Sequence, residues 1–308
     1  MANIATRQNE PKHIAQLQAQ RMLYDQVRKI KLIRLFGATA INALWVYIAI
    51  SNWQSEIMVV IGSGLLVAFE YLTEQFWQER IHKKAVLVQE VFDTEVLDLP
   101  WNEDHTLIGS KPMSDEIAQW SARYNDKRYK DAPLQNWYAD KVDQIPLTYA
   151  RLCCQKSNID WDVGLRKRYI FGYVLLIVAI VAVFAILIRF WGIAEVNKYW
   201  VFFAAVLPLL KIGWEETKGS FKAIENLKRM RNRIDAKWQE LLQGEASDAE
   251  IDSASRVWQD EIFRHRLHSP VLPRFIYRLK RSEDEVTMYR SSEALADEVL
   301  ASDALMQR

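Results

Sequence analysis

The feature that most constrains the fold of this chain is an uncharged apolar stretch at residues 169–188, YIFGYVLLIVAIVAVFAILI. At about 1.5 Å of rise per residue, a helix over this stretch reaches about 30 Å, the thickness of a bilayer core. Strands rarely exceed about ten residues, and a soluble core helix would carry a polar face. Basic residues flank the stretch, from Arg166 to Arg168 before it and Arg189 after it. We therefore predict a transmembrane helix here.

The overall composition hides this segment. The chain has 308 residues, of which 50% are hydrophobic and 26% charged, and its net charge is +1 at pH 7. These averages fit a soluble protein, because apolar and charged segments cancel in the mean. A net charge near zero gives no bulk attraction to polymeric nucleic acid, so none is expected as a partner. The only cysteines, Cys153 and Cys154, are adjacent and specify no disulfide framework, which suits a reducing cytosol. The polar first thirty residues predict no signal peptide.

Three further apolar segments predict three more spans. Residues 35–53 are uncharged and carry aromatic residues toward their far end, as a span does at the membrane interface. Residues 57–69 follow after a short connection, so the two segments predict a helical hairpin. Residues 199–210 form a fourth, short segment, for which a buried interfacial helix is the alternative to a span. The fold class is thus an all-α integral membrane protein with four transmembrane helices in two hairpins.

The basic residues around these segments set the expected orientation. They gather at residues 28–34, 80–84 and 166–168, whereas the connection between the first two spans carries no Lys or Arg. Cytoplasmic loops carry the excess of basic residues, so both termini and the insert between the hairpins are predicted to be cytoplasmic. The expected organisation is an N-terminal cytoplasmic helix (1–34), a transmembrane hairpin (35–72), a stalk and helical insert (73–165), a second hairpin (166–214), a helical stalk and C-terminal helix (215–280), and an acidic, poorly ordered tail (281–308).

A long helix is predicted over residues 215–242. Its apolar residues repeat at steps of three and four and form a coiled-coil-like seam of Phe221, Ile224, Leu227, Ile234, Trp238 and Leu241. Such a seam suits association of several copies, so we expect a homo-oligomer. Packing inside one protomer against residues 81–92 is the open alternative. Ser247 and Glu250 have the capping-box spacing that begins a further helix.

The sequence motifs of known enzyme classes are missing from the chain. There is no GxSxG, no phosphate-binding Gly-rich loop, no HExxH and no Cys/His set with zinc spacing. His265 and His268 are the only close histidine pair, and the sequence shows no further ligands beside them. No catalytic residue, metal or cofactor is therefore predicted.

Three segments are dense in arginine, acidic and aromatic residues, at 92–102, 137–169 and 259–270. A guanidinium group pairs with phosphate and an aromatic ring stacks on a base, so this mixture favours an anionic ligand that carries bases. The candidate phosphate contacts are Arg151, Lys156, Arg264 and Arg266, and the candidate stacking rings are Trp101 and Trp161. The alternative is that Asp98, Asp160, Asp162 and Glu261 pair with Arg151, Arg166, Arg264 and Arg266 and lock the stalks together.

Three polar residues within the predicted spans are candidates for a conduction path. Glu70 ends the second apolar run and Lys211 ends the fourth, and ionisable residues at such depth usually face protein or water. Snorkelling to the interface is the alternative, and the longer lysine does this more readily. Asn42 in the first span needs a hydrogen-bond partner, either in a lumen or on a neighbouring helix.

Three motifs resemble one known family. They are FDTEVLDLPWN, then WYADKVDQIPLTYARLCCQKSNIDWDVGLRKRY leading into the apolar stretch, and then WQDEIFRHR. Together with the two-plus-two hairpin layout they resemble the SMODS-associated four-transmembrane effectors, over roughly residues 15–280. The middle motif is the most specific of the three.

The resemblance implies a role in the cyclic-oligonucleotide-based antiphage systems called CBASS, in which a nucleotidyltransferase senses infection. It implies an effector that a cyclic di- or trinucleotide activates, and that oligomerises and permeabilises the bacterial inner membrane in abortive infection. It assigns no ligand residue. A membrane channel or scaffold gated by a partner protein, without a nucleotide ligand, is the alternative. A membrane-bound enzyme is disfavoured by the missing motifs.

Overall fold

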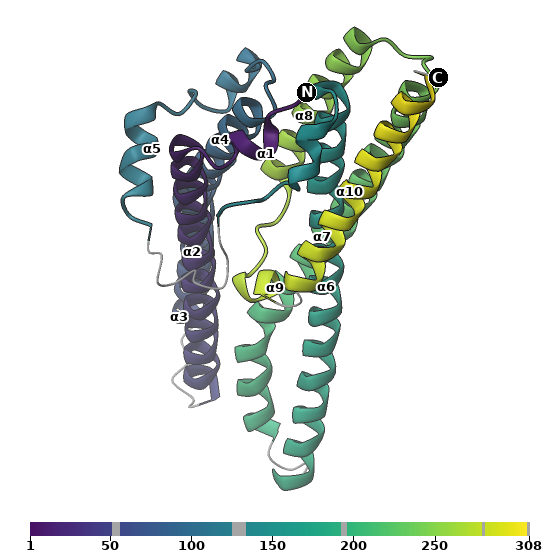
Figure 1. Cartoon of the computed structure of the whole chain (residues 1–308). Helices are drawn as coiled ribbons and strands as arrows, with labels where there is room; N and C mark the ends of the chain where they lie inside the picture. The colour runs from purple at the N-terminus through teal and green to yellow at the C-terminus, as the bar shows by residue number, and fades with distance from the viewer. Residues whose placement is uncertain (51–55, 125–133, 192–195, 279–280, 307–308) are drawn as a thin grey trace.

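The computed structural model describes the chain except for residues 51–55, 125–133, 192–195, 279–280 and 307–308. All regular elements within the described ranges are helices, which confirms the all-α class. The expected connections within both hairpins therefore fall partly outside the described residues. Figure 1 shows long helices that run roughly parallel, with both ends of the chain at the end of the molecule opposite the hairpin tips.

The first hairpin and its stalk form one long helical pair. After the short α1 (Ile4–Arg7), α2 (Pro11–Ile50) runs the full length, and α3 (Glu56–Tyr71) returns beside it. A π-helical segment, η1 (Leu72–Gln78), leads from α3 into α4 (Glu79–Val96), which packs on α2. The predicted continuation of the second span into a stalk is thus present. π-Helical turns are rare and are frequently found at functional sites.

The insert between the stalks consists of short helices. They are the 3₁₀ segment η2 (Glu103–Leu107), α5 (Ser114–Ser121), which packs on α2, and the 3₁₀ segment η4 (Asp140–Gln144). Glu116 accepts a hydrogen bond of 3.1 Å from the Met113 backbone at the start of α5.

The second half of the chain repeats the long-helix arrangement. α6 (Leu147–Trp191) and α7 (Val196–Leu242) pack side by side, and α8 (Asp248–His268) follows. The Ser247 hydroxyl and the Glu250 carboxylate form the predicted capping box at the start of α8. The chain closes with α9 (Arg274–Arg278) and α10 (Arg281–Met306).

Glycines allow close approach within each hairpin. A Cβ atom added at Gly37 would lie 2.4 Å from the Phe69 ring, and one at Gly213 would lie 2.2 Å from the Tyr173 ring. Small residues at such crossings are typical of helix pairs packed in membranes.

The apolar seam of α7 packs inside the protomer. Ile224, Leu227, Ile234, Trp238 and Leu241 are buried and belong to one core cluster with residues of α4, α6 and α10. Phe221, at the end of the seam, is 58% exposed. The structure therefore packs the seam within one protomer, but mainly against α6, α2 and α8 and not against residues 81–92, of which only Phe92 shares its cluster.

The tail differs from expectation. The sequence predicts a poorly ordered segment at 281–308, whereas α10 is a 26-residue helix that packs on α6. Ala296 and Val299 are fully buried in the main core cluster, with Leu295 and Leu300 packed against it. Three- and four-residue spacing of small apolar side chains gives this acidic helix a narrow buried face, which the composition alone does not reveal.

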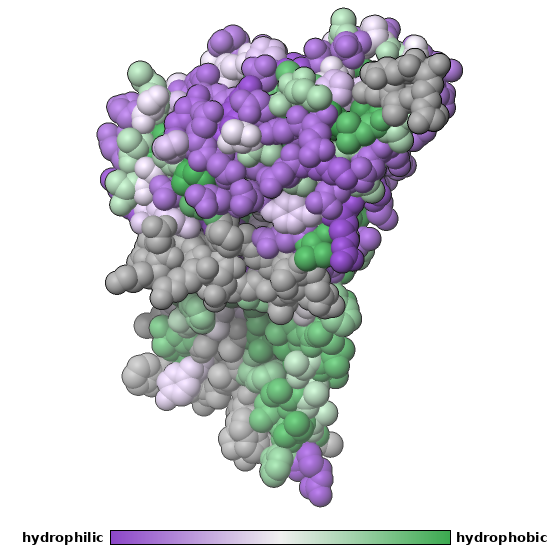
Figure 2. Space-filling view, in the orientation of Figure 1, coloured by the Kyte–Doolittle hydropathy of each residue, from purple (hydrophilic) through white to green (hydrophobic). Residues whose placement is uncertain are grey.

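The surface divides into a polar half and an apolar half. Figure 2 shows hydrophilic residues over the half that holds the insert and α8, and hydrophobic residues along the hairpins. Among the described residues, one helix, Leu147–Phe190, is long and apolar enough to cross a membrane. Only 6% of its most apolar 18-residue stretch is buried. α3 has 16 residues and α7 contains Pro208, so the four-span topology stays a prediction.

Candidate ligand-binding site

A cavity of about 430 Å³ lies where the stalk helices α2, α4, α6 and α8 meet α9. Cavities of this size hold small-molecule ligands. Arg166, at its edge on α6, comes three residues before the apolar stretch 169–188, so the cavity adjoins the hairpin half of the molecule. We call it the arginine cavity, after its five basic lining residues Arg21, Arg28, Arg166, Arg266 and Arg274.

Helical spacing brings these groups to one place. On α2, Leu17, Arg21, Tyr24 and Arg28 recur at steps of three and four and so face the same side. On α6, Asn158, Asp162 and Arg166 recur at steps of four in the same way. The remaining arginines come from the end of α8 and from α9.

The lining carries an excess of positive charge. Five arginines face two carboxylates, Asp93 and Asp162, which leaves a net charge of 5 − 2 = +3 with histidines neutral. Asp25, just outside the lining, lies 3.0 Å from Arg28 and 3.9 Å from Arg274 and lowers the excess to +2. An excess of this size matches the charge of an anion with two phosphates.

Arg166 is held on one side and unpartnered on the other. Its Nε donates to Asp162 Oδ2 at 3.0 Å, and the same oxygen lies 2.7 Å from His265 Nε2. Burial alone would raise the pKa of Asp162, but Arg166 and His265 hold it well below its usual range. The Nη1 atom of Arg166 is buried and has no hydrogen-bond partner among the described residues. A buried donor without a partner is costly, so this atom is a natural contact for a bound anion.

Arg266, another lining residue, is anchored by Asp93. It pairs with the buried Asp93, which also accepts a hydrogen bond of 3.1 Å from Gln259. Burial by itself would lower the pKa of Arg266, but Asp93 raises it above the ordinary value, so the guanidinium stays charged.

Aromatic rings alternate with these charges. The guanidinium carbon of Arg28 lies 4.9 Å from the centroid of the Tyr277 ring. Trp137 and Trp161 meet edge to face with centroids 5.2 Å apart, and Trp137 Nε1 donates to Asn158 at 3.0 Å. Rings beside cations provide stacking surfaces for nucleobases.

The structure places two of the predicted ligand residues in this lining, Trp161 and Arg266. Arg151 and Lys156 lie elsewhere on α6. Arg151 is buried, donates to the Leu97 carbonyl at 2.7 Å and pairs with Asp252 at 2.7 Å, and Lys156 pairs with Asp235. These contacts fasten α6 to its neighbours.

Trp101 and Arg264 also lie outside the lining. Trp101 packs edge to face on His105 with centroids 5.5 Å apart, and the Lys111 ammonium lies 5.1 Å from the Trp101 ring. Arg264 is exposed on α8, where its Nε donates to the Asp260 carbonyl at 3.3 Å.

The alternative of stalk-locking ion pairs describes part of the structure. Asp162 pairs with Arg166 as expected, and Asp98 lies 3.9 Å from Arg151. Asp160 pairs instead with Arg231 at 3.1 Å, and Glu261 pairs with Arg233.

Sequence reasoning missed Arg28, Arg166, Arg274 and Tyr277 as site residues. Arg28 and Arg166 belong to the basic clusters beside the predicted spans, so their charge was attributed to membrane orientation and, for Arg166, to an ion pair between the stalks. Their four-residue spacing from Tyr24 and Asp162 was the signal that could have placed them on a shared face.

Two of the predicted pore residues contact each other. Lys211 Nζ lies 3.0 Å from Glu70 Oε2, which joins α7 to α3 across the two hairpins. The Lys211 side chain is 54% exposed and that of Glu70 is 27% exposed. Asn42 is half-buried on α2.

The chain was compared with curated proteins, solved structures and protein families. No curated protein and no solved structure matches the chain. One family model, described as the SMODS-associating 4TM effector domain, matches residues 2–295. The match covers nearly the whole chain and confirms the family that the three motifs indicate. This protein belongs to the SMODS-associating four-transmembrane effector family.

Proposed function

We propose that this protein is a membrane effector that a cyclic di- or trinucleotide activates, and that the active form oligomerises and permeabilises the bacterial inner membrane in antiphage defence. The observation that carries the proposal is the arginine cavity, with its positive excess, its stacking rings and the unpartnered Nη1 of Arg166. Phosphates pair with guanidinium groups and bases stack on rings, so a cyclic oligonucleotide uses both features at once. The chain itself acts as a binder and not as an enzyme.

The position of the cavity supports a link between ligand and membrane. Arg166 and the apolar stretch 169–188 lie on the single helix α6, and Arg28 and the first predicted span lie on α2. A ligand that draws these arginines together therefore acts on the helices that enter the hairpins. Lys31 on α2 also pairs with Glu216 on α7 and donates to the Val271 carbonyl at 2.6 Å, which couples both hairpins to the rim of the cavity.

Exposed apolar side chains support four spans. Both hairpins carry large hydrophobic residues on their outer faces, among them Phe36, Leu44, Ile61, Leu65, Phe171, Val178, Val181, Phe203 and Leu207. Contiguous apolar surface of this extent belongs in a membrane or an interface. In the proposed topology the hairpin tips lie on the far side of the membrane and both termini lie in the cytoplasm.

A binding and leakage experiment tests the proposal. The full chain, purified in detergent and reconstituted in liposomes, is mixed with a panel of cyclic di- and trinucleotides, with linear dinucleotides as controls. We expect one cyclic compound to bind, to increase the particle size and to release an encapsulated dye. If no member of the panel binds, the proposal fails and the partner-gated channel or scaffold takes its place. Binding without leakage would retain the ligand and refute the pore.

A further inference from the structure

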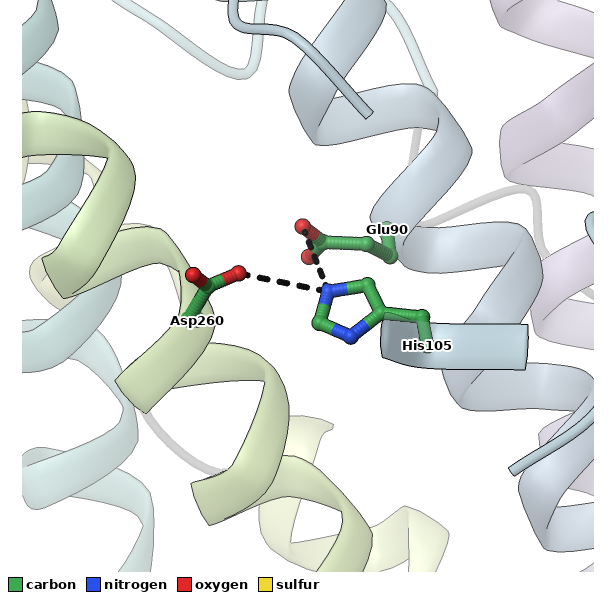
Figure 3. A group of neighbouring side chains, drawn as sticks. All are labelled: Glu90, His105 and Asp260. Atoms are coloured by element: carbon green, nitrogen blue, oxygen red, sulfur yellow. Dashed lines mark ion pairs between the residues drawn. The ribbon is translucent and has the colours of Figure 1, made fainter. Parts of the chain in front are cut away.

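A second cluster lies outside the arginine cavity and joins three separate elements. Glu90 on α4, His105 on η2 and Asp260 on α8 point toward one another (Figure 3). His105 Nε2 lies 3.6 Å from Glu90 Oε1 and 3.4 Å from Asp260 Oδ1. One candidate ligand atom from each residue lies within 4.8 Å of the other two.

The His105 ring is fixed and its inward nitrogen is unpartnered. The residue is 5% exposed, and its ring stacks on Phe263 with centroids 3.8 Å apart and an interplanar angle of 22°. The edge of Trp101 confines it from another side. Nε2 is buried and has no hydrogen-bond partner within the described ranges, although it points between two carboxylates. A buried polar atom without a hydrogen bond calls for an explanation, and an ion bound between His105 and the two carboxylates is one that fits this geometry.

The outer carboxylate oxygens are already occupied. Gln259 Nε2 donates to Glu90 Oε2 at 2.8 Å, and Asn102 Nδ2 donates to Asp260 Oδ2 at 3.0 Å. These bonds turn the inner oxygens, Oε1 and Oδ1, toward His105. Hydrogen bonds that orient ligand side chains in this way are the usual support of a metal site.

The cluster retains a negative charge after its internal pairing. Arg256 Nη2 lies 2.9 Å from Glu90 Oε1 and 2.5 Å from Asp260 Oδ1. Two carboxylates and one guanidinium leave −2 + 1 = −1 when His105 is neutral. Each carboxylate oxygen has two lone pairs, so it can accept a hydrogen bond from Arg256 and bind a cation at the same time. Uncompensated charge in a buried cluster is unfavourable, and a cation offsets it.

We propose that Glu90, His105 and Asp260 bind a divalent transition-metal ion, with Zn²⁺ the best match, and that this ion ties the insert to both stalks. Zinc binds imidazole nitrogen and carboxylate oxygen at about 2.0–2.2 Å, so neighbouring ligands in a tetrahedron lie about 3.3–3.5 Å apart. The separation of 3.4 Å from His105 Nε2 to Asp260 Oδ1 lies within this range, and that of 3.6 Å to Glu90 Oε1 is about 0.1 Å longer. Calcium requires about six to eight oxygen ligands, and this cluster provides two carboxylates and an imidazole.

Metal titration of the full chain tests the proposal. Protein in detergent is stripped with a chelator and then titrated with zinc chloride in a calorimeter, and bound zinc is measured by mass spectrometry. We expect one zinc ion per chain. His105→Ala removes a direct ligand, and loss of an orienting partner alone already costs about 10–100-fold, so we expect affinity to fall by at least about 100-fold. His268→Ala, an exposed histidine on α8, is the matched control and should bind as the wild type does.

A spectroscopic variant covers the case in which His105→Ala does not fold. Cobalt replaces zinc in the wild type and in Asp260→Asn, which keeps the side-chain shape. We expect visible absorption bands of ordered Co²⁺ in the wild type and their loss in Asp260→Asn. The proposal is overturned if the wild type binds no stoichiometric zinc or cobalt. It is equally overturned if His268→Ala loses as much zinc as the variants of the cluster.

Discussion

Lys211 Nζ lies 3.0 Å from Glu70 Oε2, and this ion pair joins the two predicted transmembrane hairpins. The two residues lie 141 positions apart in the sequence, and each ends an apolar run. Each therefore provides the partner that the other needs near the membrane. The contact links α3 to α7 where the hairpins leave the stalks.

We expect reversal of one charge to open this contact. Glu70→Lys places two cations side by side and should increase dye leakage from liposomes without ligand, whereas Glu70→Lys combined with Lys211→Glu restores the pair. An exposed ion pair contributes about 0.2–1 kcal/mol, so the effect on unfolding should be small beside the effect on leakage. Equal leakage from the wild type, the single variant and the double variant would show that the pair does not hold the hairpins closed.

Glu70→Gln tests the conduction path separately. If Glu70 lines the active pore, removal of its charge lowers the preference for cations over anions while oligomer size stays the same. The reversal potential of liposome currents under a salt gradient measures this preference. An unchanged reversal potential would place Glu70 outside the path.

Arg166→Lys is expected to lower the affinity of the protein for the cyclic nucleotide that the wild type binds. Lysine keeps the charge beside Asp162 but has no second guanidinium nitrogen to direct at the ligand. Loss of one charge-assisted bond corresponds to about 1.5–3 kcal/mol, or about 10- to 150-fold in Kd. Arg229→Lys is the control, because Arg229 is exposed and contacts Glu225 on its own helix. Equal Kd values for all three proteins would exclude Arg166 from the site.

The free energy of unfolding should decrease as the pH falls, because His82 is buried in its neutral form. Burial, assisted by the charge of Lys31, lowers the pKa of His82 from 6.5 to about 4. Between these values the unfolded chain binds a proton and the folded chain does not, so the free energy of unfolding decreases as pH falls. The loss is at most about 3 kcal/mol. Thermal unfolding of the wild type and His82→Gln at pH 4–7 measures it, and we expect a shallower pH dependence in the variant. His268→Gln should retain the slope of the wild type.

Ile234→Ala should destabilise the protomer and leave its assembly unchanged. Ile234 is fully buried in the core, and such a truncation costs about 2–5 kcal/mol. Phe221→Ala, at the exposed end of the same seam, should change the free energy of unfolding by less than about 0.5 kcal/mol. Denaturant unfolding and size-exclusion chromatography measure both effects. If Ile234→Ala instead forms a smaller oligomer with an unchanged free energy of unfolding, the seam lies between protomers.

Periodicity predicted several parts of the fold well. The 3.6-residue repeat identified the buried face of α7, and the capping box at Ser247 located the start of α8. These features depend on neighbours within a few residues, so local sequence contains them. The same repeat could not say whether the α7 seam packs against its own chain or against a copy, because both surfaces are apolar.

The candidate sites required the tertiary structure. The sequence indicated the right kinds of residue for an anionic ligand, and two of them, Trp161 and Arg266, line the arginine cavity. Arg28 and Tyr277, which meet at 4.9 Å, come from opposite ends of the chain. No local spacing relates Glu90, His105 and Asp260 either, so the absence of a zinc motif was an accurate observation that could not reveal this cluster.

By itself, the sequence determined the all-helical class, the apolar stretch at 169–188, the helical stalks and, through three motifs, the family. Only the tertiary structure decided which arginines share a cavity, which acids meet His105, and that Glu70 pairs with Lys211. The physical reason is that hydrophobic periodicity fixes which face of each helix is buried. The partner of each polar residue on that face depends on how far helices shift and rotate against one another, and those shifts are set by the packing of the whole core.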